Sequence, residues 1–283
     1  MAPLPPPSPE APLLGPAAAV PESPLVVITG ASSGLGQALA LRFYQAGYRL
    51  ALVARRVSEI ESWARASQID ITRYQIYIAD VSDANAMVVM GNTCLQAQGV
   101  PDVVIANAGI SVGVDTACRT DIDVMARVFA TNNIGMMATF HPFVAAMAAR
   151  AVTGSGGTLV GIGSVAGIRG LPGHGAYSAS KAAAITYLES LRGEMKPLGV
   201  RVVTVCPGYI DTPLTQKNRY TMPFLMQPED FAEKAFQAIV TGASYSVIPW
   251  QMGVVAKLMR LLPNALYDKL LAGRPRKHRD GEG

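Results

Sequence analysis

The sequence is poor in cysteine and histidine, with three of each among its 283 residues. The cysteines, Cys94, Cys118 and Cys206, lie far apart without a C-x-x-C pair, and the histidines show no spacing typical of metal ligands. A disulfide framework and a metal centre are therefore not expected. Unpaired thiols are typical of a reducing compartment, which predicts a cytoplasmic protein.

Long apolar runs and early basic residues are also absent. No stretch of about 18 uninterrupted apolar residues exists, so a membrane-spanning helix is not expected. The first lysine or arginine is Arg42, and proline repeatedly interrupts the apolar residues before it, which disfavours a secretory signal.

Charged residues make up only 16% of the chain, and the formal net charge is +4. Much of the excess lies in one basic run, from Arg274 to Arg279, and is not spread over a face that could bind nucleic acid. We therefore expect a small-molecule site and no nucleic-acid partner. Half of the residues are apolar, which is enough to bury a large core.

Composition divides the chain into three parts. Residues 1–23 are rich in proline and alanine, which predicts a disordered tail. From residue 24 to residue 250, short β-branched runs alternate with longer helical segments, which is typical of βαβ units. Residues 251–283 have apolar residues in helical spacing, a break at Pro263 and a basic end, which predicts an amphipathic C-terminal extension.

The alternation predicts an α/β protein: a Rossmann-type, doubly wound, seven-stranded parallel sheet in a single domain with a C-terminal helical extension. The β-branched runs are continuous enough to be covered on both faces. The expected strands are 25–29, 49–54, 74–79, 102–106, 158–163, 201–206 and 245–249. The expected helices lie near 34–47, 58–67, 83–98, 120–150, 176–197 and 228–241.

A glycine-rich segment, TGASSGLG, follows the first expected strand and leads into a helix. Glycine permits a sharp reversal and lets the backbone approach a pyrophosphate, while the start of the helix presents free N–H groups to the anion. We therefore predict a dinucleotide cofactor at this segment. Its predicted contacts are Gly30, Ser32, Ser33, Gly34, Leu35 and Gly36.

The second expected strand is followed by Arg55 and Arg56. A fold that prefers NAD would carry an acidic residue here for the ribose 2′-hydroxyl. Two guanidinium groups instead suit a 2′-phosphate, because arginine offers several planar donors to phosphate oxygens. The sequence thus favours NADP(H) over NAD(H), the alternative being a solvated basic start of the next helix.

Polar and small residues follow the third and fourth expected strands: Asp80 and Val81, then Asn107, Ala108 and Gly109. Open parallel sheets bind ligands at this edge, so we expect these residues to contact the cofactor. Asp80 can accept a hydrogen bond from the adenine amino group or cap the helix that begins near residue 83. The residues after the fourth strand can lie against the ribose or simply turn the chain.

A serine, a tyrosine and a lysine stand close together in a glycine- and alanine-rich stretch. Tyr177 and Lys181 are one helical turn apart and share a face. An ammonium near a phenol favours the phenolate, which lowers the pKa of Tyr177 and fits it to exchange a proton with a carbinol oxygen. Ser164, at the end of the fifth expected strand, can point its hydroxyl at the same oxygen and polarise a carbonyl.

These segments form an ordered set of motifs: T-G-x-x-x-G-x-G from Thr29, D-V at Asp80, N-A-G at Asn107, N-x-x-G at Asn132, Ser164, Y-x-x-x-K at Tyr177 and P-G-x-x-x-T at Pro207. In this order they resemble the classical type of the short-chain dehydrogenase/reductase family, over about residues 25–249. The resemblance implies a catalytic tetrad of Asn132, Ser164, Tyr177 and Lys181. It implies that Tyr177 is the acid/base, that Lys181 also holds the nicotinamide ribose and that Asn132 anchors a relay water. Further cofactor contacts implied by the last motif are Pro207, Gly208, Ile210 and Thr212, with Thr212 at the carboxamide.

The chain departs from the family pattern at a few places. Asn133 directly follows Asn132; the distance to Gly135 favours Asn132, and the other role open to either asparagine is a backbone bond that bends the helix. Ala106 stands where the family usually has a second asparagine. Ser33 stands where many NADP-using relatives have a basic residue, so recognition of the phosphate would depend on Arg55 and Arg56.

The segment after the sixth expected strand is expected to form a lid over the reacting centre. Met222, Phe224 and Met226 either line an apolar substrate slot or pack beneath a short helix. His174 either borders the substrate or is an ordinary loop residue. The C-terminal extension suits an anionic membrane surface, the mouth of an apolar pocket, or packing against the same or a neighbouring subunit.

Together these features predict an NADPH-dependent oxidoreductase that reduces the ketone of a hydrophobic, lipid-like substrate, reversibly and without a metal. The resemblance implies a homodimer or homotetramer formed through the long helices. A non-catalytic NADP(H)-binding sensor or scaffold is the alternative. A sugar-nucleotide epimerase is disfavoured, since its glycine segment would read T-G-x-x-G-x-x-G and its substrate domain would be larger.

Overall fold

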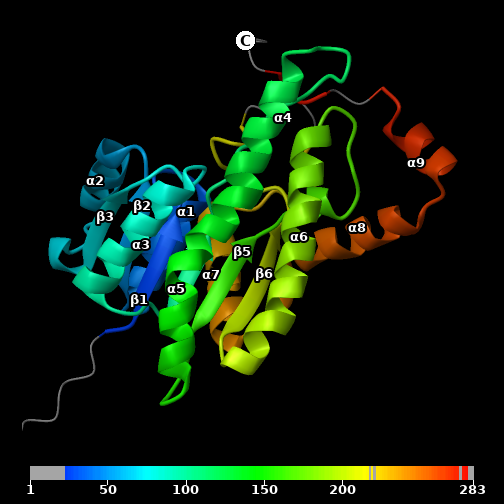
Figure 1. The fold of residues 1–283 in the computed structure, drawn as a ribbon. Coiled ribbons are helices and arrows are strands. Elements are labelled where there is room, and N and C mark those ends of the chain that lie inside the picture. Colours follow the sequence, from blue (N-terminus) through cyan, green and yellow to red (C-terminus); the bar gives the residue numbers. More distant parts are fainter. Residues whose placement is uncertain (1–22, 217, 219–220, 274–275, 280–283) are drawn as a thin grey trace, which may run out of the picture.

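A computed structural model describes residues 23–216, 218, 221–273 and 276–279. Nearly all of the tail predicted over residues 1–23 lies outside the described residues. The rest forms a parallel sheet of seven strands with helices on both faces (Figure 1). The strands are β1 (Leu25–Thr29), β2 (Arg49–Ala54), β3 (Tyr74–Ile78), β4 (Val103–Ala106), β5 (Thr158–Ile162), β6 (Arg201–Pro207) and β7 (Tyr245–Ile248).

The strand order is β3-β2-β1-β4-β5-β6-β7, and every neighbouring pair is parallel. The order reverses between β1 and β4, where successive connections leave for opposite halves of the sheet. Ligands bind in open α/β sheets at the carboxyl ends of the strands beside such a switch point. The predicted fold class, a doubly wound seven-stranded sheet in one domain, is confirmed.

The core forms two layers because successive residues of a strand point to opposite faces. Val26 and Ile28 of β1 belong to one apolar cluster with Phe43 of α1, whereas Leu25 and Val27 belong to another on the opposite face. The helices on the first side are α1 (Leu35–Gln45), α2 (Val57–Ala66) and α7 (Pro228–Thr241). The other side is covered by α3 (Ala84–Gln98), α5 (Gly135–Ala151) and α6 (Gly175–Met195).

The helix predicted over residues 120–150 is divided. It consists of α4 (Asp121–Phe129), a single π-helical segment at Ala130–Ile134, and α5. A π turn inserts one residue into the helical repeat, so side chains on either side of it change their angular position. Both asparagines, Asn132 and Asn133, lie in this inserted turn.

The C-terminal extension contains two further helices, α8 (Trp250–Leu261) and α9 (Asn264–Leu271), separated at Pro263 as the sequence predicted. Helix α8 packs on the edge strand β7, where a Cβ on Gly253 would lie 3.0 Å from Val247 Cβ. The chain beyond α9 returns toward the start of α4 (Figure 1). The described part of the basic end therefore packs on its own chain.

Candidate active site

The predicted proton-handling residues converge at the carboxyl end of β5. Lys181 Nζ donates a 2.8 Å hydrogen bond to the carbonyl of Ile162, the last residue of β5, and lies 5.9 Å from the centre of the Tyr177 ring. Ser164 follows two residues after Ile162, and its side chain is close enough to the Tyr177 hydroxyl to lower the pKa of that group. Ser164 Oγ also accepts from the backbone N–H of Ala166 at 3.1 Å. The three side chains, separated in sequence, thus meet in one place.

Burial controls the proton affinities of this cluster. It raises the pKa of Tyr177 above its ordinary value, and only the hydrogen bond from Ser164 works in the opposite direction. Burial also lowers the pKa of Lys181 to about 8. The predicted lowering of the Tyr177 pKa is therefore wrong for this structure, because burial raises this pKa and the opposing contribution comes from Ser164.

Asn132 is fixed by bonds to two other segments. Its side-chain oxygen accepts from Ile110 N at 2.9 Å, while its amide donates to Ile110 O at 3.0 Å and to Ser180 Oγ at 2.9 Å. Asn133 donates to the backbone oxygen of Ser180 at 2.8 Å. A Cβ on Gly109 would lie 3.3 Å from Asn132 Oδ1 and 3.5 Å from Lys181 Nζ. Asn132, the asparagine favoured by the distance to Gly135, thus lies near Lys181, and its catalytic role stays a prediction.

Ser180 is a residue that the sequence analysis missed. It is fully buried, and its hydroxyl donates to the backbone oxygen of Tyr177 at 2.8 Å while accepting from Asn132. Ser180 therefore joins the π turn to the helical turn that carries Tyr177. The only sequence signal was its place inside Y-x-x-x-K, and a serine on a helix gives no indication of burial.

The glycine segment between β1 and α1 is tightly folded. Gly30 and Gly34 have positive φ angles of 68° and 56°, which favour glycine. A Cβ on Gly36 would lie 2.2 Å from the oxygen of Gly30, and a Cβ on Gly30 would lie 2.8 Å from Ala108 Cα. The backbone can therefore take this path only without side chains at these two positions. We call this tight turn before α1 the glycine cradle. Ser32, Ser33 and Leu35 are half-buried beside it.

Asn107 holds the ends of β1 and β4 together. Its amide donates to Thr29 O at 2.9 Å, and its backbone N–H donates to Thr29 Oγ1 at 3.1 Å. Its side chain therefore holds the two strand ends together, and the backbone of Ala108 lies against Gly30.

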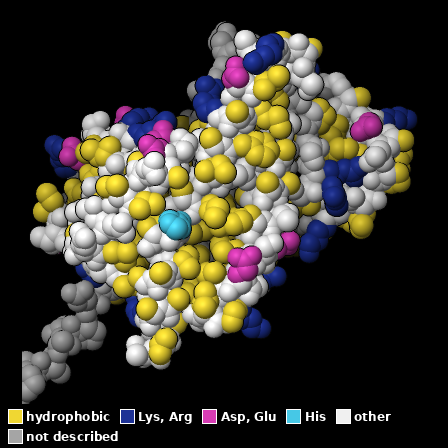
Figure 2. Space-filling model, in the orientation of Figure 1, with side chains coloured by type: hydrophobic (Ala, Val, Ile, Leu, Met, Phe, Trp, Pro, Cys, Tyr) yellow, Lys and Arg dark blue, Asp and Glu magenta, His cyan; other side chains and the backbone are white. Residues whose placement is uncertain are grey.

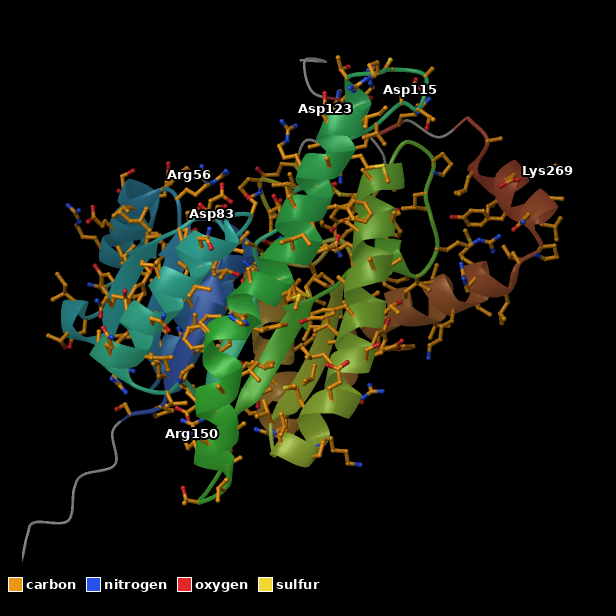
Figure 3. The ribbon with its side chains drawn as sticks, in the orientation of Figure 1. Arg56, Asp83, Asp115, Asp123, Arg150 and Lys269 are labelled. Carbon is orange, nitrogen blue, oxygen red and sulfur yellow. The ribbon has the colours of Figure 1, made fainter. Side chains whose placement is uncertain are left out.

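Arg56 lies near Asp83 at one end of the sheet, whereas Arg150 lies at the opposite end (Figure 3). Arg55 pairs with Asp80 at 3.0 Å, and Arg56 donates to Ser32 Oγ at 3.2 Å. The Arg56 guanidinium therefore borders the glycine segment, and that of Arg55 lies at the residues after β3.

Asp80 does not cap helix α3. It accepts from the Ser82 hydroxyl and backbone N–H at 2.7 and 3.0 Å, and these bonds, more than Arg55, lower the pKa of its carboxyl. The cap of α3 is Asp83, which accepts from two backbone N–H groups at the start of the helix. Val81 is buried against Gly135, where an added Cβ would lie 2.7 Å from its side chain.

The residues after β6 turn back over the glycine segment. Gly208 N donates to Ile248 O at 2.8 Å, and Ile210 pairs with Met226 in an isolated bridge. Thr212 is buried, and a Cβ on Gly34 would lie 3.3 Å from its Cβ. Thr212 thus packs directly against Gly34 of the glycine segment, five residues after Pro207 ends β6.

The residues predicted to contact substrate are less closely gathered. His174 is buried three residues before Tyr177, with its Nδ1 3.1 Å from Pro172 O, and burial lowers its pKa. Met222 Sδ accepts from Asn218 at 3.5 Å, whereas Phe224 is half exposed. Met226 packs against the core on the α7 side. Their contact with substrate remains a prediction.

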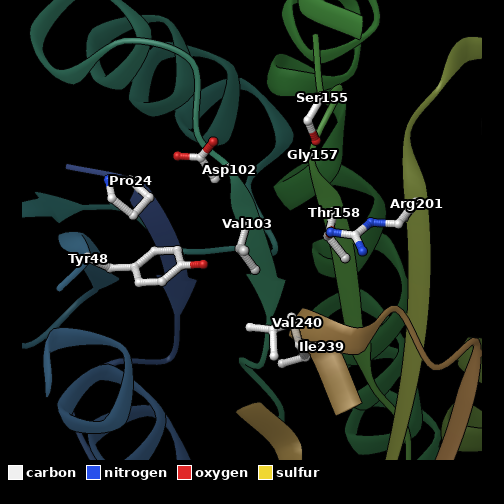
Figure 4. Close-up of a pocket in the computed structure, with 10 residues that line it drawn as sticks. All are labelled: Pro24, Tyr48, Asp102, Val103, Ser155, Gly157, Thr158, Arg201, Ile239 and Val240. Atoms are coloured by element: carbon white, nitrogen blue, oxygen red, sulfur yellow. The ribbon is translucent and has the colours of Figure 1, made fainter. Parts of the chain in front are cut away.

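A cavity of about 220 Å³ lies at the opposite edge of the sheet, where Pro24 precedes β1 and Thr158 begins β5 (Figure 4). Tyr48, Asp102 and Arg201 also line it, and none of the predicted site residues does. Among the described residues no cluster of ligands could hold a metal ion, and no helix is long and apolar enough to cross a membrane.

Comparison with known sequences finds a family profile described as short chain dehydrogenase that matches residues 24–223. An uncharacterized oxidoreductase of Myxococcus xanthus is 37% identical over 242 residues, covering 86% of this chain and 94% of that protein. A dehydrogenase/reductase SDR family protein 7-like of Drosophila melanogaster is 32% identical over 273 residues, covering 91% and 82%.

Solved structures share the fold. An alcohol dehydrogenase from Thermococcus sibiricus, complexed with 5-hydroxy-NADP, superposes with a TM-score of 0.70 at 26% identity, covering 80% of this chain and 96% of its own. A short chain dehydrogenase/reductase from Burkholderia phymatum, in complex with NAD, gives a TM-score of 0.75 at 21% identity, covering 90% and 97%.

Proposed function

Because this chain belongs to the short-chain dehydrogenase family, within which it is an oxidoreductase that uses a nicotinamide dinucleotide, we propose that it is an NADPH-dependent reductase of apolar ketones. It would act reversibly on the corresponding secondary alcohols. The observation that carries the proposal is the meeting of Ser164, Tyr177 and Lys181 at the sheet edge that also carries the glycine cradle.

The described residues fit a dinucleotide. The glycine segment turns sharply into the start of α1, where the backbone N–H groups of the first helical turn can bind an anion. Thr212 lies against Gly34 of this segment, and Gly109 lies near Lys181. A bound nicotinamide supplies the hydride that adds to the carbonyl carbon.

The protein's own groups handle the proton. Tyr177 donates its phenolic proton to the carbonyl oxygen, and Ser164 donates a hydrogen bond to the same oxygen. Lys181, with a pKa of about 8, exchanges protons in the neutral range and restores the proton of Tyr177. Asn132 fixes the segment of Ile110 and the turn of Ser180 on either side of this path.

The proposed preference for NADPH depends on Arg55 and Arg56, which follow β2. Replacing Arg55 and Arg56 by alanine is expected to weaken NADPH binding by roughly tenfold or more and NADH binding much less, since charge-assisted bonds to the 2′-phosphate are lost. Dissociation constants measured by the fluorescence of the reduced cofactors check this. Arg65→Ala, which removes an exposed arginine from the same helix region, is the matched control. Equal losses for both cofactors contradict the preference.

The reaction itself is tested with NADPH and a panel of apolar ketones, by following the absorbance of the reduced cofactor. Tyr177→Phe is expected to lower the rate about 10²- to 10⁴-fold, because the proton donor is lost while the ring remains. Tyr187→Phe, a half-buried tyrosine on the same helix, is the matched control. Cofactor binding without turnover of any ketone would instead favour the non-catalytic sensor or scaffold.

An apolar substrate that comes from a membrane surface is supported by the C-terminal helices. Trp250, Leu258 and Leu261 are 70%, 60% and 80% exposed and share one face of α8, beside the exposed cations Lys257 and Arg260. Such a face suits peripheral contact with anionic lipid.

This surface is joined to the active-site loop. Arg169 donates to Leu262 O at 2.8 Å and to Asn264 at 3.1 Å, and its guanidinium lies 3.7 Å from the centre of the Tyr267 ring. Tyr267 in turn donates to Gly170 O at 2.6 Å. Arg169 and Gly170 belong to the segment that connects Ser164 to Tyr177, so a lipid surface at α8 would lie near the mouth of the site.

Self-association is supported by another face. Apolar side chains gather over α5 and its neighbours (Figure 2), and the exposed ones include Val89, Ile122, Met125, Ile134 and Met137. A second copy packed on the long helices, giving a homodimer or homotetramer, would cover this patch. The three unpaired cysteines support a reducing compartment such as the cytoplasm.

A further inference from the structure

The basic end of the chain, for which the sequence left a membrane surface, the mouth of an apolar pocket and packing on a subunit open, makes many contacts with the active-site edge. We call residues 276–279 the strap. Arg279 binds Asp121 with two bonds of 2.7 and 3.0 Å, and these bonds lower the pKa of the Asp121 carboxyl to about 2. His278 O accepts from Gly113 N at 2.7 Å. The strap is thus held to the start of α4 and to the loop after β4.

The other two residues of the strap reach the segments that follow β5 and β6. Lys277 is only 8% exposed, and its Nζ donates to Asn218 Oδ1 at 2.7 Å and to Leu214 O at 3.2 Å. Arg276 packs over Gly173, where an added Cβ would lie 2.8 Å from Arg276 Cβ. Arg276 also donates to Val114 O at 3.2 Å and pairs with Asp115 at 3.7 Å.

The strap therefore joins three segments that leave the sheet at the edge of Ser164 and Tyr177. Asp115, which pairs with Arg276 of the strap, lies beside the N-terminal start of α4 (Figure 3). The neighbouring Val114 approaches the first turn of α6, with a side-chain carbon 3.7 Å from a Cβ placed on Gly175. His174 lies three residues before Tyr177, and its pKa is lowered by burial and also by the charge of Lys277. The segments that the strap joins therefore include the one that leads directly into Tyr177.

We propose that the strap forms the outer wall of the substrate cleft and limits how long a ketone can be while its carbonyl still reaches Tyr177. This inference rests on the proposed reductase function. The strap can be displaced only if its hydrogen bonds, those of buried Lys277 included, and the Arg279–Asp121 ion pair are lost together. A long apolar chain would have to displace it, whereas a short one would not.

A single substitution at Gly113 is expected to displace the strap. A Cβ on Gly113 would lie 2.2 Å from Lys277 O and 2.8 Å from His278 O, so Gly113→Ala leaves no room for the strap in its present position. A chain that ends at Gly273 removes the strap altogether and does not depend on that glycine. Lys269→Ala removes an exposed cation of α9 and is the matched control for loss of positive charge.

The first measurement is amide hydrogen exchange, which needs no substrate. In Gly113→Ala and in the shortened chain, exchange over residues 110–116 and 211–216 is expected to become roughly tenfold faster, because the bonds to the strap are lost, while exchange in β1 and β2 stays unchanged. If both variants exchanged as slowly as the wild type and Lys269→Ala, the proposed role of the strap would be wrong.

The second measurement is selectivity among straight-chain methyl ketones from butanone to tetradecanone. Loss of the strap is expected to raise the ratio of kcat/KM for the longest ketone to that for the shortest about tenfold. Faster exchange with an unchanged ratio overturns the strap as a determinant of specificity. A wild-type chain that reduces no ketone contradicts the reductase proposal, and amide exchange alone then decides whether the strap holds these segments.

Discussion

Single buried polar groups decide how the candidate active site is positioned, and α6 offers a matched pair. Ser180 Oγ accepts from Asn132 and donates to Tyr177 O, whereas the hydroxyl of Ser178, also buried, has no hydrogen-bond partner among the described residues. Removing a partnered hydroxyl leaves a buried donor unsatisfied, while removing an unpartnered one relieves a cost that was already present.

Ser180→Ala is therefore expected to lower the free energy of unfolding by about 1–2 kcal/mol and to lower kcat for ketone reduction, with little change in NADPH affinity. Ser178→Ala should be neutral or slightly stabilising. Urea unfolding and steady-state kinetics of both variants check this. If the two variants lost the same stability and activity, Ser180 would be an ordinary core residue.

Lys181 gives the site a pH dependence whose sign follows from its burial. Its pKa is about 8 in the folded chain and about 10.4 in an unfolded one, so between these values the unfolded chain binds more protons. The free energy of unfolding, relative to Lys181→Met, should therefore rise by roughly 3 kcal/mol as pH increases through this window.

Urea unfolding of the wild type and of Lys181→Met at a series of pH values measures this difference, because subtraction cancels the titration of the other groups. Lys269→Met, at an exposed position, is the control for loss of a lysine. The same pH trend for both variants would show that burial of Lys181 is not its cause.

At the scale of helices and strands, the sequence predicted most of the fold. Each strand is an apolar, β-branched run between polar or glycine residues, and burial on both faces makes such runs conspicuous. The glycine segment was equally clear, because only glycine permits the contact between residues 30 and 36.

The π turn at Ala130–Ile134 could not be predicted in this way. Insertion of one residue changes the helical repeat too little for a periodicity to reveal it. What stabilises the turn is tertiary: Asn132 and Asn133 both bond to Ser180 on α6, which is distant in sequence. The strap escaped prediction for the same reason, since its partners Asp121 and Asn218 lie far from residues 276–279 along the chain.

For the molecule as a whole, the basic C-terminal region divides into two parts with different tasks. The strap residues are engaged with the active-site edge, so they are not available to a membrane in this arrangement. Helix α8 instead presents exposed apolar side chains together with exposed cations, and each cation near an anionic surface contributes about 1 kcal/mol of attraction.

Leu258→Glu combined with Leu261→Glu is therefore expected to reduce cosedimentation with phosphatidylserine-containing vesicles by roughly tenfold or more, because two apolar contacts are replaced by repelling charges. Val152→Glu, at an 86% exposed apolar position after α5, is the matched control and should bind as the wild type does. Neither substitution touches the proton-handling residues, so reduction of a dissolved ketone should persist in all three proteins. Equal loss of binding in the control would indicate a general effect of charge. Undiminished binding of the double variant would show that α8 does not make the lipid contact. Sedimentation without vesicles would show whether the protein pellets by self-association instead.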